Sequence, residues 1–132
     1  WYNNLHNFYK EIKISSLEGR YKYSLNEPSI NKPDDILSLS YFDNFYGNVD
    51  PVMKVTYNRE YFLFENLRIT FDQKIKYTLL NTSVQNIIYD NECVMEAKVP
   101  INYSENRIEN IINHPTSRFS KYSRGLSLLK IF

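Results

Sequence analysis

The chain has 132 residues and a formal net charge of only +1, so its length fits one domain and its composition excludes nucleic-acid binding through bulk basic charge. We expect no nucleic acid partner, and any anion site must come from a local arrangement of cations. The single cysteine excludes an internal disulfide and suits a reducing compartment. No apolar run approaches the ~20 residues that a membrane-spanning helix needs, and no signal peptide is visible. We therefore expect a cytoplasmic protein that contacts a membrane only through segments outside this chain.

The first part of the chain predicts two strands followed by a helix. The strands cover residues 8–14 and 20–25, with a turn at Gly19 between them. The helix begins at Pro33, where a fixed φ and two following aspartates favour a helix start, and it ends at Gly47. Its apolar positions recur at helical spacing: Ile36, Leu39, Phe42, Phe45 and Tyr46.

Strands dominate the middle of the chain. We expect them at residues 52–59, 67–71, 74–79, 87–89 and 92–100, the third one extending the second or starting anew. Residues 60–66 are predicted as a turn region or a short helix. A helix follows over residues 103–113, because Asn102 and Glu105 have capping-box spacing and three isoleucines form an apolar stripe. The tail, residues 116–132, is basic and aromatic up to Gly125 and then apolar, and no element is assigned to it.

Charged residues recur on one face of the predicted strands, because side chains alternate between two faces. In the strand around residues 93–99, Glu96 and Lys98 lie on one face, while Cys93 lies on the apolar face and is expected to pack. One such strand is typical of a half-exposed antiparallel sheet. Its recurrence predicts an α+β fold with an antiparallel β-tunnel, a barrel-like sheet with a charged lumen and flanking helices.

The cations of these faces define a candidate site for a polyanion. Buried like charges are costly unless a counter-ion neutralises them, and phosphates offer oxygens for charge-assisted contacts with Arg and Lys. The cations expected to face one lumen are Lys13, Arg20, Lys22, Arg59, Arg68, Lys98, Lys121 and Arg124. Glu11, Asp72 and Glu96 are candidate ligands of a hard divalent cation, which prefers carboxylate and phosphate oxygens. The opposing interpretation is a small α+β domain whose charged strand faces meet solvent and form weak cross-strand ion pairs.

Six segments follow one another in a recognisable order. They are Phe8-Tyr9-Lys10-Glu11-Ile12-Lys13, Arg20-x-Lys22, Pro51-x-x-x-x-x-Tyr57-x-Arg59, Leu67-Arg68-Ile69-Thr70-Phe71-Asp72, Val94-Met95-Glu96-Ala97-Lys98 and Ser120-Lys121-Tyr122. In this order, and over nearly the whole chain, they resemble the vacuolar transporter chaperone (VTC) domain. This domain is the polyphosphate polymerase branch of the triphosphate tunnel metalloenzyme (CYTH-like) superfamily.

The resemblance implies a β-tunnel that adds the terminal phosphate of ATP, or of another nucleoside triphosphate, to polyphosphate. It also implies a divalent metal cofactor, Mn²⁺ or Mg²⁺. The catalytic residues that it implies are Lys13, Lys22, Arg68 and Lys121. Further substrate-binding residues are Arg20, Arg59, Lys98, Ser120 and Arg124. The metal ligands are Glu96 and Glu11.

One departure from the family pattern stands at the beginning of the chain. Family members carry a lysine-bearing strand and an Arg-x-Arg strand before the hydrophobic-Glu-x-Lys strand, whereas this sequence opens at Trp1. We therefore interpret residues 1–132 as a single, partial VTC-like tunnel domain that lacks the N-terminal strands and is inactive by itself. Two alternatives stay open. One is a module that binds polyphosphate or another polyanion without turnover, and the other is a triphosphatase of the same tunnel superfamily.

Overall fold

The computed structural model describes four segments of the chain, residues 10–15, 20–25, 40–80 and 86–131. The chain divides into two compact units, Trp1–Pro51 and Val52–Phe132. All strand pairings in the described residues are antiparallel, which confirms a sheet-rich α+β fold. The described strands form three sheets and none of these closes into a barrel, so the tunnel and the single domain stay predictions. No helix within the described segments is both long and apolar enough to cross a membrane.

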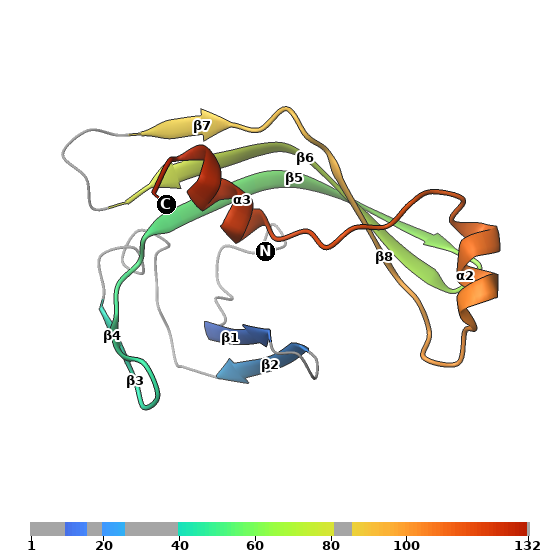
Figure 1. Ribbon diagram of the computed structural model, residues 1–132, viewed down its shortest axis with the longest axis horizontal. Helices are drawn as coiled ribbons and strands as arrows, with labels where there is room; N and C mark the ends of the chain where they lie inside the picture. Colours follow the sequence, from blue (N-terminus) through green and yellow to red (C-terminus); the bar gives the residue numbers. More distant parts are fainter. Residues whose placement is uncertain (1–9, 16–19, 26–39, 81–85, 132) are drawn as a thin grey trace. The chain divides into compact units, whose positions relative to one another are not determined.

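The first unit contains two small hairpins, drawn in blue and cyan in Figure 1. In one of them, β1 (Lys10–Ser15) pairs with β2 (Arg20–Leu25), as the alternation of charged and apolar residues predicts. In the other, β3 (Tyr41–Asp43) pairs with β4 (Gly47–Val49). The predicted start of the first strand at residue 8 lies outside the described residues.

The prediction of a helix ending at Gly47 is wrong for the part of that range that the structure describes. Asp43 accepts hydrogen bonds from the backbone amides of Phe45 (2.8 Å) and Tyr46 (3.1 Å), which close a turn. Gly47 then takes a positive φ of 73°, a conformation that glycine adopts without strain. The aromatic residues of this segment have helical spacing in the sequence, but they do not form a buried stripe, since Phe45 is 92% exposed. The first part of the predicted helix, residues 33–39, lies outside the described residues.

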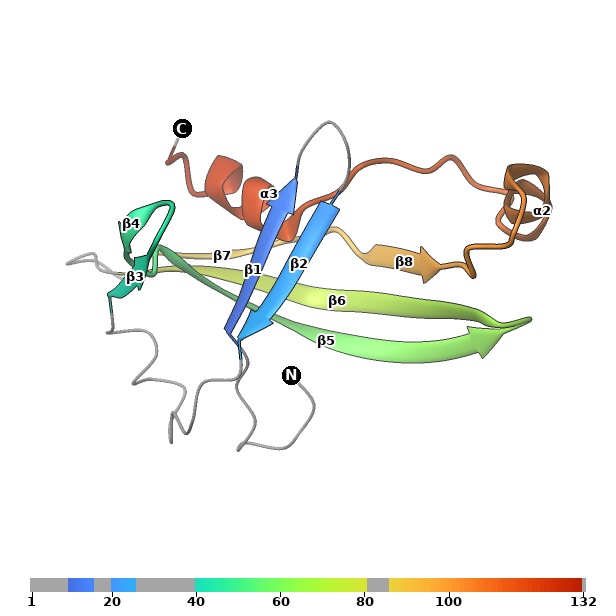
Figure 2. The same cartoon turned by 90° about the horizontal axis from the view of Figure 1, so that it is seen from below.

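The second unit is built on a four-stranded sheet whose central strand is β6 (Leu67–Leu79), as Figures 1 and 2 show. β5 (Met53–Phe64) pairs along one edge of β6. β7 (Ile87–Tyr89) and β8 (Val94–Lys98) share the other edge, and both confirm predicted strands.

β5 and β6 form one long hairpin. The turn or short helix predicted over residues 60–66 is wrong for most of that range, because β5 continues up to a turn of two residues. These residues, Glu65 and Asn66, both have positive φ (46° and 68°), as tight hairpin turns of this length require. The strands predicted at 67–71 and 74–79 are one continuous strand.

A β-bulge in β6 decides which residues share a face. In the register of β5 and β6, Tyr57 faces both Lys74 and Ile75, and Lys74 has a positive φ of 52°. The inserted residue shifts the alternation by one position, so Ile75 and Tyr77 lie on the same face as Asp72. Burial agrees with this register, since Asp72, Ile75 and Tyr77 are all buried.

The predicted helix after the sheet is confirmed as α2 (Glu105–Ile111). Its N-cap is Ser104, whose side chain accepts a backbone hydrogen bond, and not Asn102. α2 lies toward the same end of the sheet as the turn between β5 and β6 (Figures 1 and 2). There the Tyr103 hydroxyl donates to the Glu65 carbonyl oxygen at 2.6 Å.

A second helix, α3 (Lys121–Leu128), is absent from the sequence prediction and covers one face of the sheet, here named the inner face (Figure 1). Gly125 permits the close approach. A Cβ atom there would come within 2.5 Å of Tyr77 Cδ1 and within 2.6 Å of Met53 Sδ. Leu129, directly after the helix, completes the core. The part of the inner face under α3 is its apolar half: Met53, Val55, Ile75, Tyr77, Leu79 and Ile88.

Near the turn between β5 and β6, the opposite face of the sheet carries exposed apolar side chains. Phe62 and Phe64 are 52% and 54% exposed, and Met95 is 49% exposed. Cys93, which the sequence predicts to pack, is exposed as well, so that prediction is wrong. In the second unit the core therefore lies on the same face of the sheet as the charged side chains.

Candidate functional site

Charged side chains lie together on the part of the inner face that is not under α3. They come from β5, β6 and β8 and from the first residue of α3. The residues of this charged half are Arg59, Arg68, Thr70, Asp72, Glu96, Lys98 and Lys121. Residues directly opposite one another in antiparallel strands project from the same face, which explains the grouping. The cross-strand pairs are Arg59–Asp72, Thr70–Glu96 and Arg68–Lys98. Four cations and two carboxylates give the charged half a net charge of +2.

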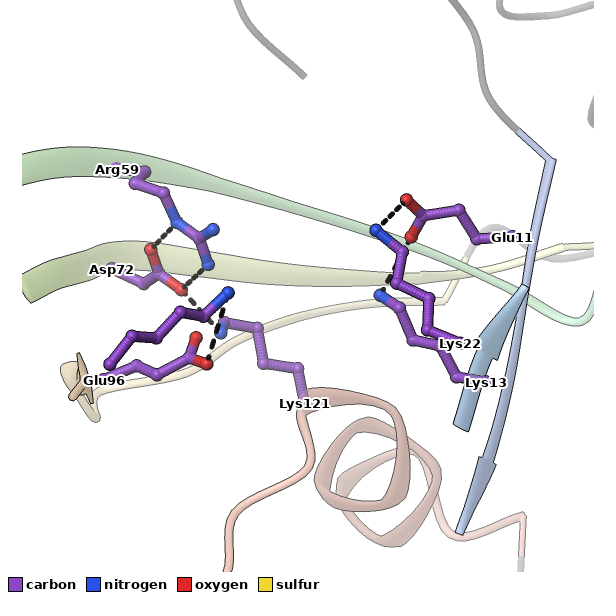
Figure 3. Close-up of polar contacts among 8 residues, drawn as sticks. Glu11, Lys13, Lys22, Arg59, Asp72, Glu96 and Lys121 are labelled. Atoms are coloured by element: carbon purple, nitrogen blue, oxygen red, sulfur yellow. Dashed lines mark hydrogen bonds and ion pairs between the residues drawn. The ribbon is translucent and has the colours of Figure 1, made fainter. Parts of the chain in front are cut away.

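Asp72 holds two of these cations, as Figure 3 shows. The Arg59 guanidinium donates from Nε to Oδ1 at 2.5 Å and from Nη2 to Oδ2 at 2.7 Å, which makes a bidentate pair. Lys121 Nζ approaches Oδ2 at 2.5 Å. The Asp72 side chain is 1% exposed and both of its oxygens are engaged. Asp72 is therefore a counter-ion for two cations, and this geometry favours that role over the metal ligation that the sequence suggested.

The electrostatics of this cluster favour the ionised forms. Burial raises the pKa of the Asp72 carboxyl, but the hydrogen bonds from Arg59 and Lys121 outweigh it and hold that pKa below its usual value. The bond to Asp72 is also the main reason why the pKa of Arg59 is raised. The centre of the Tyr57 ring lies 5.1 Å from Arg59 Cζ and 4.9 Å from Lys121 Nζ, within the range of cation–π attraction for both.

Two cations lie directly opposite one another at the other end of the charged half, Arg68 on β6 and Lys98 on β8. Like charges in this cross-strand position destabilise a sheet. Glu96 offsets them weakly, because its Oε1 is 3.9 Å from Lys98 Nζ and both side chains are more than half exposed. A bound anion would relieve the repulsion at this end.

Thr70 lies between the two ends, directly opposite Glu96. Its Oγ1 is buried and has no hydrogen-bond partner among the described residues. A buried hydroxyl without a partner costs free energy, so such groups are uncommon in native proteins. Thr70 therefore adds a buried polar side chain to the charged half, between its two pairs of cations.

The predicted site residues of the first unit lie on the β1–β2 hairpin. Lys13 lies directly opposite Lys22, and their Nζ atoms approach the Glu11 carboxylate at 3.3 Å and 2.5 Å (Figure 3). The hydrogen bond from Lys22, followed by that from Lys13, lowers the pKa of Glu11. The lysine side chains are 72% and 55% exposed, so solvent screens both ion pairs. Arg20 begins β2 opposite Ser15, and its side chain is outside the described part.

Two of the predicted substrate contacts belong to α3. Ser120 is its N-cap, and the Ser120 Oγ accepts from the Ser123 amide at 3.3 Å, which leaves the hydroxyl hydrogen available to a ligand. Arg124 donates from Nε and Nη2 to the Asp90 carboxylate at 2.6 Å and 2.8 Å. This geometry favours an anchoring role for Arg124 over the substrate contact that the sequence predicts.

One carboxylate of the charged half is suited to hold the expected metal. Within the described segments no group of three or more His, Cys, Asp or Glu side chains converges. Mg²⁺ usually keeps several waters and takes one or two carboxylates together with substrate phosphates, so it does not need such a group. Glu96 fits that donor set, because its side chain is 52% exposed and its ion pair with Lys98 is long.

Ordered strands with these charges, followed by a helix that begins at Ser-Lys, form the pattern of a known family. Comparison with protein families matches residues 4–130 to the VTC domain. The chain belongs to the VTC domain family. Membership indicates a polyphosphate-related function and confirms the resemblance seen in the sequence. Comparisons of this VTC domain with curated proteins and with solved structures found no match.

Sequence reasoning missed two residues in or beside the charged half of the VTC domain. Tyr57 has no predicted role in the site, yet it lies two residues before Arg59 in β5 and so shares its face. Thr70 alternates with Arg68 and Asp72 in β6. In both cases the sequence signal is the alternation of side chains between the two faces of a strand, which also located the charged residues.

Proposed function

We propose that this VTC domain is part of a polyphosphate polymerase, which transfers the terminal phosphate of ATP to a growing polyphosphate chain inside a charged β-tunnel. An oxygen of the acceptor's terminal phosphate attacks the γ-phosphorus of ATP. The bond from that phosphorus to the β–γ bridging oxygen breaks, and ADP leaves. Family membership supports the substrate class. The observation that carries the proposal is the gathering of cations on one sheet face: Arg59, Arg68, Lys98 and Lys121.

The chain's own side chains supply electrostatic stabilisation. A phosphoryl group in transfer spreads negative charge over its oxygens, and cations that are already in place stabilise that charge without reorganisation. Arg59 and Lys121, which are partly buried, bind the transferred phosphate in this proposal. Arg68 and Lys98 bind phosphates further along the chain, which relieves their mutual repulsion.

The remaining members of the proposed site follow from the family pattern. Glu96 holds Mn²⁺ or Mg²⁺, and the bound metal would supply charge neutralisation at the phosphates. Ser120 adds a hydroxyl donor at the start of α3. The first unit contributes further phosphate-binding and metal-binding side chains in this proposal: Glu11, Lys13, Arg20 and Lys22. We propose a cytoplasmic location, where ATP is the available donor.

The test compares two glutamates of the full-length protein. The protein is incubated with ATP and Mn²⁺, and the products are resolved on a gel stained for polyphosphate. Glu96→Gln should abolish synthesis. Glu92→Gln should retain it, because Glu92 is similarly exposed but contacts Arg124 outside the charged half, at 3.8 Å.

Each other outcome points to a different function. Unchanged synthesis in Glu96→Gln would remove the metal role of that residue. Wild-type protein that binds polyphosphate without making it would be a binding module. Release of inorganic phosphate without polymer would identify a triphosphatase.

A further inference from the structure

Asp72 is the most deeply buried charged side chain of the charged half, and the proposed reaction assigns it no contact with substrate or metal. We propose that Asp72 is a positioning residue, which fixes Arg59 and Lys121 side by side as one binding unit for a single phosphate group. The inference rests on the proposed function and deepens it. It also makes the binding unit depend on α3, because Lys121 is the first residue of that helix.

The contacts with Asp72 orient both cations without exhausting their donors. Of the five N–H groups of a guanidinium, Asp72 takes the one on Nε and one on Nη2 of Arg59, and Tyr61 makes a further side-chain hydrogen bond with Arg59, so donors still remain for a ligand. Lys121 turns one of its three N–H groups to Asp72 and keeps two. The Arg59 and Lys121 side chains are 26% and 19% exposed, so a ligand can reach the remaining donors.

Charge balance supports the same role. Arg59 and Lys121 contact one carboxylate, and without it two cations would repel each other at short range. With Asp72 the cluster keeps a net charge of +1, which still attracts phosphate. The Tyr57 ring lies beside both cations and restricts their side chains further.

A second carboxylate provides a matched comparison within the same molecule. Asp90 holds Arg124 of α3 by a bidentate pair, and the Asp90 side chain is 1% exposed, as is that of Asp72. Asp90 follows β7 and accepts a hydrogen bond from Tyr77 in the apolar half of the inner face. Both carboxylates therefore anchor α3, but only Asp72 contacts cations of the charged half.

The experiment measures the binding of inorganic tripolyphosphate to the full-length protein by calorimetry, together with thermal unfolding of each variant. Asp72→Asn removes the charge and keeps the size, and it should weaken binding by at least ~10-fold. Asp72→Glu keeps the charge but displaces it by one methylene, and it should weaken binding by roughly 3-fold or more. Asp90→Asn should lower the unfolding temperature and change the affinity by less than ~2-fold.

Three results would overturn the inference. Equal or tighter binding by Asp72→Asn would show that Asp72 only offsets charge. Wild-type affinity in Asp72→Glu would show that its position is unimportant. Equal losses in Asp72→Asn and Asp90→Asn would show that Asp72 acts only by anchoring α3. A wild-type protein that does not bind tripolyphosphate would instead refute the proposed function itself.

Discussion

Gly125→Ala places a methyl group at the closest contact between α3 and the sheet. The new Cβ would lie 2.5 Å and 2.8 Å from two carbons of the Tyr77 ring and 2.6 Å from Met53 Sδ. These distances are roughly 1 Å shorter than ordinary van der Waals contacts. The Met53 side chain can rotate, but the Tyr77 ring is fully buried and its hydroxyl donates to Asp90 at 3.1 Å. The helix must therefore move away from the sheet.

Two opposing terms set the magnitude. Alanine is favoured over glycine inside a helix by about 1 kcal/mol. Overpacking a filled contact costs about 1–3 kcal/mol, and the rigid Tyr77 ring places this site at the upper end of that range. We expect Gly125→Ala to lower the free energy of unfolding by about 1–2 kcal/mol.

Urea denaturation measures this change, with Ser127→Ala as the matched control. Ser127 is an exposed position of the same helix, so alanine there gains helix propensity without a steric conflict. The displaced helix also carries Lys121, so Gly125→Ala should bind tripolyphosphate more weakly as well. A Gly125→Ala protein that is stabilised like Ser127→Ala would refute the close contact between helix and sheet.

Two further predictions concern acid stability and the aromatic ring beside the site. The pKa of Asp90 is lowered to about 2 from its ordinary value of 3.8, chiefly by hydrogen bonds from Arg124. A carboxyl with a depressed folded pKa stabilises the fold above its unfolded pKa, so about 2 kcal/mol of stability should be lost as the pH falls from about 4 to about 2. Acid unfolding of Asp90→Asn should lack this pH dependence, and a profile identical to that of the wild type would contradict the assignment. Tyr57→Leu should weaken tripolyphosphate binding by roughly 3-fold, whereas Tyr57→Phe, which keeps the ring, should not, and equal affinities in the two variants would exclude a cation–π contribution.

The alternation of side chains along strands located much of the charged half from sequence. Arg68, Glu96 and Lys98 lie on the polar faces that were expected, because the strands that carry them are regular and their register is simple. The hairpin that pairs Lys13 with Lys22 is another local feature. Local patterns of this kind are visible to an analysis of short windows.

Contacts between distant segments were not visible in the same way. Asp72 meets Lys121 only because α3 folds back over the sheet, and α3 is short, with a glycine in its middle. Its packing against Tyr77, and not its own propensity, stabilises it. The prediction of a helix ending at Gly47 failed for the opposite reason, because a local pattern was misleading. Exposed aromatic residues of a hairpin happen to have the spacing of a helical stripe.

The bulge at Lys74 makes the number of residues in β6 as important as their identity. Asp72 and Tyr77 lie on one face although an odd number of positions separates them, whereas a regular strand requires an even number. Deleting the extra residue, Lys74, would give a regular strand that still places Ile75 and Tyr77 on the face of Asp72, because four positions would then separate Asp72 from Tyr77. Deleting Gln73 as well would turn Ile75 and Tyr77 to the opposite face, so α3 would have no apolar surface to cover and Lys121 would have no support beside Asp72. In related chains, a gap of one residue at this point is therefore expected to be tolerated better than a gap of two.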